Sequence, residues 1–67
     1  MTKFSIVDTG ISKQEIKYFV VELKKSNLIA GTEKDENNDT VYHTHNIVAV
    51  RKLADEYEGL MVDIYKA

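Results

Sequence analysis

The sequence predicts a small α+β domain whose elements follow one another in the order β-α-β-β-α-β. Two segments, Ser12–Ser26 and Asn46–Glu58, carry apolar residues at helical spacing. Short apolar or alternating runs stand before and after each of these segments, as expected for strands. We therefore expect a four-stranded sheet with two helices packed on one of its faces.

The first β-α pair has the clearest local signals. Lys3–Asp8 alternates apolar and polar residues, so that Phe4 and Ile6 would face the helices. Ser12 and Glu15 form an S-x-x-E capping box at the start of the first helix. Asn27 suits the left-handed residue that ends a helix, since asparagine tolerates positive φ better than most residues.

The middle of the chain predicts two strands joined by a polar turn. Leu28–Thr32 is short and contains Gly31, which is typical of an edge strand. Glu33–Asp39 is rich in aspartate, asparagine and glutamate and predicts the turn. Val41–His45 would form the third strand.

The second helix carries its acidic residues at the unfavourable end. Gly59 is expected to end the helix, and Leu60–Tyr65 to form the last strand. Asp55, Glu56 and Glu58 crowd the C-terminal turn, where the helix dipole disfavours anions. Screening by solvent explains such residues without function. An acidic patch kept for a basic partner is the functional alternative.

This element order resembles the ferredoxin-like split sheet, a fold-level analogy that hosts many unrelated functions. The resemblance implies that the third strand is central although it is the most polar. It also implies that Leu60–Tyr65, the most apolar strand, lies at an edge. Either the strand order differs from this fold, or the apolar edge pairs with a second copy. In the second case we expect a homodimer whose edge includes Met61, Asp63 and Tyr65.

Composition narrows the class of protein. The chain has 67 residues, which predicts one domain over residues 1–67, and it has no cysteine, so disulfides and thiolate metal sites are excluded. With 43% hydrophobic and 30% charged residues, it is globular rather than disordered. No apolar run has the length of a membrane span and no signal-peptide pattern opens the chain, so a cytoplasmic protein is expected.

The predicted topology separates the charges into two ends of the sheet. One end would collect the acidic side chains, and the other would collect Lys3, Lys24, Lys25, Lys66 and the amino terminus. Such a dipolar molecule orients charged partners. The acidic end comprises Asp8, Asp35, Glu36, Asp39, Asp55, Glu56 and Glu58.

Two patterns raise the question of metal binding. Asp35-x-Asn37-x-Asp39 matches the start of a calcium loop, but the following positions of that motif are not met, and an Asx-rich turn is the better interpretation. His43 and His45 are the weak candidates for zinc or copper, without an evident third ligand. We predict no cofactor.

Catalysis is not predicted, because the chain has no cysteine nucleophile, no G-x-S-x-G turn and no phosphate-binding glycine loop. The best prediction is a small regulatory protein that acts by protein–protein contact through the acidic end. Its partner would be a basic protein, such as a nucleic-acid-binding protein that it inhibits. Short, acidic, cysteine-free chains are common among phage and mobile-element regulators.

The alternative is a winged-helix-like DNA-binding protein. Residues 13–27 would be the recognition helix and residues 28–45 the wing, with phosphate contacts from Lys13, Lys17, Lys24 and Lys25. Only Met1–Ile11 precedes that helix, which is too short for the usual supporting helices. An acidic wing would also be repelled by phosphate.

Overall fold

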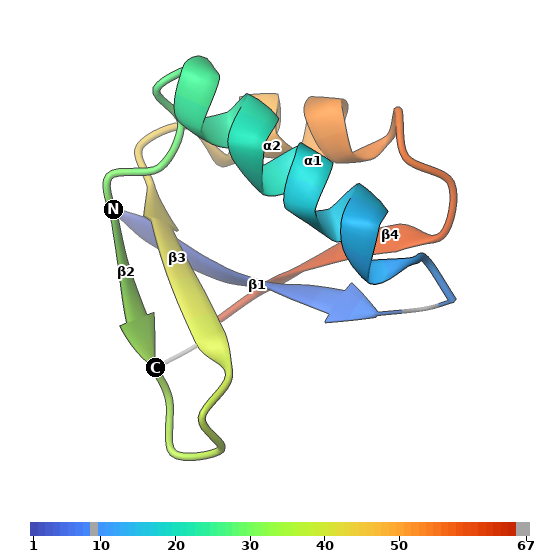
Figure 1. Ribbon diagram of the computed structural model, residues 1–67. Coiled ribbons are helices and arrows are strands. Elements are labelled where there is room, and N and C mark those ends of the chain that lie inside the picture. The colour runs from blue at the N-terminus through green and yellow to red at the C-terminus, as the bar shows by residue number, and fades with distance from the viewer. Residues whose placement is uncertain (9, 66–67) are drawn as a thin grey trace.

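The computed structural model describes residues 1–8 and 10–65, and it has the α+β architecture that the sequence predicts (Figure 1). A four-stranded antiparallel sheet carries two helices on one face. The elements are β1 (Thr2–Asp8), α1 (Lys13–Lys25), β2 (Gly31–Lys34), β3 (Thr40–Thr44), α2 (Ile47–Ala54) and β4 (Leu60–Ile64).

Helix α1 begins and ends where its capping residues predict. Ser12 is the N-cap, and its Oγ accepts a hydrogen bond from the Glu15 N–H at 3.2 Å. At the other end Asn27 has a φ of 57°, and the Leu28 N–H donates to the Leu23 carbonyl at 2.8 Å. This pairing is a Schellman motif, which satisfies carbonyl groups that the helix leaves without partners.

Helix α2 is shorter than predicted and stops at Ala54, before the acidic residues. The Glu56 and Tyr57 N–H groups donate to carbonyls three residues earlier, at 3.1 and 2.9 Å. These tighter turns replace the last turns of the expected helix. Tyr57 packs against the core from these turns, so the apolar spacing continues past the end of the helix, and Asp55 is the C-cap.

The second strand is the other boundary that the sequence places incorrectly. The expected strand was Leu28–Thr32, whereas β2 is Gly31–Lys34 and the turn is confined to Asp35–Asp39. Leu28 belongs to the end of α1, where it packs against the core. The strand therefore starts three residues later than predicted and includes Glu33 and Lys34, which the sequence assigns to the turn.

The sheet has the order β2-β3-β1-β4, so β1 and β3 are central and β4 lies at an edge. Polar β3 suits a central position because its Val41 and Thr44 side chains are fully buried. The Thr44 hydroxyl accepts a hydrogen bond from the Asn46 N–H at 3.1 Å, which satisfies a buried polar group.

The two halves of the sheet diverge at one end. Strand β1 pairs with β3 only over Thr2–Phe4, but with β4 over Phe4–Asp8. The β2–β3 hairpin therefore turns away from the second half of β1, and its tip projects from the sheet (Figure 1). This divergence opens a space between the hairpin and the second half of β1.

The core lies between the sheet and the helices. Phe4, Phe19, Leu23 and Val50 are completely buried. The Phe19 ring makes an edge contact with Tyr57 at a centroid distance of 5.5 Å, which ties α1 to the segment after α2. Val62 and Ile6, partners in the sheet, pack against the same cluster.

Candidate functional site

The turn of the β2–β3 hairpin is ordered by one aspartate. The Oδ1 atom of Asp35 accepts hydrogen bonds from the backbone N–H groups of Asn37 and Asp39, each at 2.9 Å. Asn38 takes a φ of 65°, and its N–H donates to the Asp35 carbonyl. This is an Asx turn, as the sequence predicts, and one oxygen of the Asp35 carboxylate is used to hold it.

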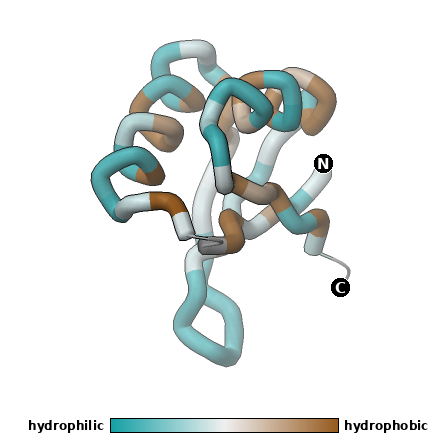
Figure 2. The backbone as a smooth tube through the Cα atoms, turned by 90° about the vertical axis from the view of Figure 1, so that its right-hand side faces the viewer, coloured by the Kyte–Doolittle hydropathy of each residue, from teal (hydrophilic) through white to brown (hydrophobic). Residues whose placement is uncertain are grey.

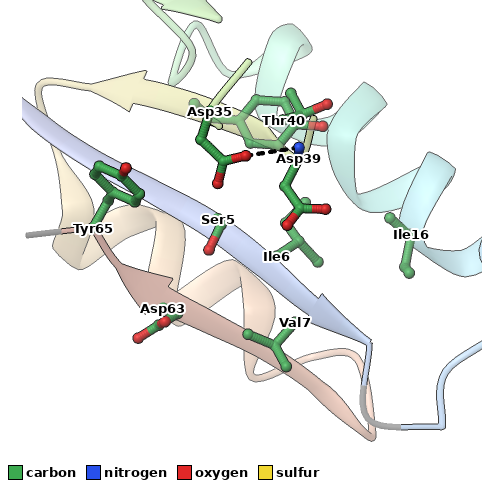
Figure 3. Close-up of a pocket in the computed structure, with 10 residues that line it drawn as sticks. Ser5, Ile6, Val7, Ile16, Asp35, Asp39, Thr40, Asp63 and Tyr65 are labelled. Atoms are coloured by element: carbon green, nitrogen blue, oxygen red, sulfur yellow. Dashed lines mark hydrogen bonds between the residues drawn. The ribbon is translucent and has the colours of Figure 1, made fainter. Parts of the chain in front are cut away.

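A cleft of about 580 Å³ opens between this hairpin and the far half of β1. It lies where the pairing of β1 with β3 has ended, so hairpin residues form one wall and the β1–β4 pair the other. Figure 3 shows Asp35 and Asp39 on the hairpin side, with Ser5 between them and Asp63 of β4. The described lining residues are Ser5, Ile6, Val7, Ile16, Asp35, Asp39, Thr40, Tyr42, Asp63 and Tyr65.

All charged side chains in the described lining of the cleft are acidic. Asp35, Asp39 and Asp63 bring three carboxyl groups to it, and its described lining contains no lysine, arginine or histidine. The remaining walls are partly apolar and include the rings of Tyr42 and Tyr65, with burial raising the pKa of the Tyr42 phenol. Such a lining suits a cation on an apolar stem, as in arginine or lysine.

The structure divides the predicted acidic end into two places. Asp35, Glu36 and Asp39 belong to the hairpin, which extends as a hydrophilic loop away from the helices (Figure 2). Asp55, Glu56 and Glu58 are exposed in the turn between α2 and β4, which lies apart from the hairpin tip (Figure 1). The Asp8 side chain and Lys66 lie outside what the structure describes.

Asp63 is the cleft residue whose role sequence reasoning missed. The sequence predicts Asp63 on the open face of the sheet and at a dimer edge, and its side chain lies on that face beside Ser5, its partner in β1, where it lines the cleft. The alternation of β4 already placed Asp63 on that face. The divergence of the two strand pairs, which opens the cleft that Asp35, Asp39 and Asp63 all line, has no signal in the local sequence.

The two histidines lie in different surroundings. His43 is half-buried on β3, with its Nε2 atom 3.3 Å from Glu33 Oε1 but without a well-aligned hydrogen bond. His45 follows the strand and is exposed. Among the described residues no group of three or more histidine, aspartate or glutamate side chains is arranged to hold a metal ion.

Glu33 also forms an ion pair across the sheet, with its Oε1 atom 3.0 Å from the Lys3 Nζ atom. The hydrogen bond from Lys3 holds the pKa of Glu33 below its ordinary value of 4.5. A lowered pKa in the folded state stabilises the fold above about pH 4.5, and this stabilisation is lost as the pH falls through the lowered pKa.

We expect the Glu33→Gln variant to lose the part of the pH-dependent stability that comes from the Lys3–Glu33 ion pair. Relative to the variant, the natural protein should be more stable at pH 7 and should lose that advantage at pH 3. Urea unfolding of both proteins at the two pH values measures the difference. An advantage of equal size at both pH values would contradict the assignment.

The lysines of the DNA-binding alternative are all exposed. Lys13, Lys17 and Lys24 follow one side of α1, and the Lys25 Nζ atom lies 3.9 Å from the Glu22 carboxylate. The winged-helix arrangement itself is not seen, because the described residues form two helices and the supposed wing is half of the four-stranded sheet. DNA binding by this helix stays a prediction.

No protein-family model, curated protein or solved structure matches this chain. Neither helix in the described part of the chain has the length and apolar character needed to cross a membrane.

Proposed function

We propose that this protein is a non-enzymatic interaction module that binds a basic segment of a protein partner in the cleft between the hairpin and strands β1 and β4. One observation carries the proposal. Asp35, Asp39 and Asp63, from segments far apart in sequence, line one partly apolar cleft whose described lining has no basic residue. An arginine or lysine side chain supplies the missing charge and an apolar stem.

The proposed binding site is smaller than the acidic end that the sequence predicts. The hairpin carboxylates would make the contact together with Asp63, whereas Asp55, Glu56 and Glu58 would contribute only to the long-range field. Basic surfaces of this kind are typical of proteins that bind nucleic acids. A regulator that covers such a surface would act as an inhibitor of nucleic-acid binding.

We also propose that the fold is a small form of the ferredoxin-like split sheet. The β-α-β-β-α-β order and the adjacent central strands β1 and β3 support this assignment. The assignment says nothing of function, since the arrangement serves many.

The first test is an NMR titration of the ¹⁵N-labelled protein with a short capped peptide of alternating arginine and serine, at about 150 mM salt. We expect shift changes at Ser5–Val7, at Asp35–Thr40 and near Asp63, and none with the matching glutamate–serine peptide. Changes centred on Asp55–Glu58 would contradict the proposed cleft. Titration with duplex DNA under the same conditions tests the alternative, which requires changes along α1.

A further inference from the structure

The two edges of the sheet are protected to different degrees. Strand β2 has four residues, includes a glycine, and carries Glu33 and Lys34, features that discourage edge-to-edge pairing. Strand β4 reads Leu-Met-Val-Asp-Ile, and none of its residues is a lysine or a proline. In the described part of the chain no strand pairs with its outer side. Strand β4 is therefore the edge open to association.

The register fixes which backbone groups of β4 point outward. The Tyr65 N–H donates to the Lys3 carbonyl at 2.8 Å. The backbone N–H and C=O groups of Asp63 and Met61 point in the same direction, toward their partners Ser5 and Val7 in β1. Backbone direction alternates along a strand, so the N–H and C=O groups of Val62 and Ile64 point away from β1. The Leu60 N–H is bound to the Tyr57 carbonyl, which leaves the Leu60 carbonyl as a further acceptor.

We propose that a second copy of this chain pairs with β4 in antiparallel fashion, with Val62 opposite Val62 on a two-fold axis. In this register the N–H of each Ile64 donates to the Leu60 carbonyl of the other copy. This hydrogen bond does not require the Leu60 N–H, which already donates to the Tyr57 carbonyl. The side chains on the helix-covered side are then apolar throughout. A register centred on Asp63 would place two carboxylates directly opposite each other and is disfavoured.

Charges beside the edge are arranged to suit a second copy. A crevice of about 280 Å³ between α2 and β4 is lined by Arg51, Ala54, Asp55, Leu60, Met61 and Val62. Arg51 and Asp55 are both exposed, one helical turn apart. A two-fold axis at Val62 brings the two crevices to one junction, where we expect Arg51 of each copy to pair with Asp55 of the other.

This assignment changes the residues expected at the dimer edge. The sequence suggested Met61, Asp63 and Tyr65, but their backbone groups are directed toward β1. Val62 and Ile64 make the contacts instead. The cleft reaches β4 through Asp63 and Tyr65, whereas the pairing uses the outward backbone groups of Val62 and Ile64, so dimerisation does not depend on the proposed binding of a basic segment.

Sedimentation equilibrium measures the mass of the full chain, which is 7.7 kDa for one copy. We expect a species of twice that mass. Val62→Pro removes an outward N–H that β1 does not need, so it should weaken dimer affinity at least about tenfold while the circular dichroism spectrum is retained. Thr32→Pro is the matched control on the other edge and should leave the dimer affinity unchanged.

A charge exchange provides a second test that does not touch the backbone. Arg51→Glu and Asp55→Lys should each weaken the dimer several-fold, and the double variant should restore most of the affinity. A monomeric natural protein at about 1 mM, a concentration that detects affinities weaker than most specific dimers, would overturn the proposal. An unchanged dimer in a folded Val62→Pro variant, or a double variant no tighter than the single ones, would also overturn it.

Discussion

Replacing Phe19 with alanine is expected to leave most of the protein unfolded at room temperature. Phe19 is completely buried and contacts the Tyr57 ring, so its removal leaves a cavity between α1 and the segment that follows α2. Truncation of a buried phenylalanine costs about 3–5 kcal/mol. A domain of this length has only a few kcal/mol of net stability, and the loss is of the same size.

Circular dichroism during urea unfolding measures this effect. Phe19→Leu keeps most of the buried volume and is expected to stay folded, with a smaller loss of about 1 kcal/mol. Tyr18→Ala, a change at the neighbouring exposed position, is the control for altered helix propensity. A loss below about 1 kcal/mol in Phe19→Ala would show that Phe19 is not part of the core described above.

The second large effect is expected at the hairpin. Asp35→Ala removes the oxygen that accepts hydrogen bonds from the Asn37 and Asp39 N–H groups. We expect a loss of about 1–2 kcal/mol in the free energy of unfolding, because two backbone donors lose their protein partner. Urea unfolding measures the loss, and amide hydrogen exchange at Asn37 and Asp39 reports on the turn itself.

Asp35→Asn is the matched control, since its amide oxygen can still accept these hydrogen bonds but carries no charge. The turn should therefore survive in this variant with less than half of the alanine penalty, while the cleft loses one carboxylate. Equal destabilisation by alanine and asparagine would mean that the negative charge, not the acceptor geometry, orders the turn.

The elements whose bounds the sequence predicts correctly are those with strong local signals. Helix α1 is bounded correctly because Ser12 caps its first turn through the Glu15 N–H and Asn27 adopts the positive φ that ends it. Helix α2 is predicted too long because the apolar spacing extends to Tyr57, which packs on the core from a tighter turn that follows the helix. Strand β2 was displaced because Leu28, apolar like a strand residue, serves the end of α1 instead.

The candidate site was predictable only in part. The Asx geometry of Asp35 followed from the sequence, and the polar hairpin was expected to carry acidic residues. The position of Asp63 in the same cleft as Asp35 and Asp39 was not predictable, because it depends on where β1 stops pairing with β3. Such a divergence arises from the twist and packing of the whole sheet rather than from residues near Asp63.

The most direct test of the central claim compares two double variants that remove the same charge. Isothermal titration of the arginine–serine peptide would measure the Kd for Asp39→Asn with Asp63→Asn, and for Glu56→Gln with Glu58→Gln. The first pair lies in the cleft and should weaken binding about tenfold, whereas the second should change it less than about twofold. Equal weakening by both pairs, or none by the first, would contradict the assignment of the cleft as the binding site.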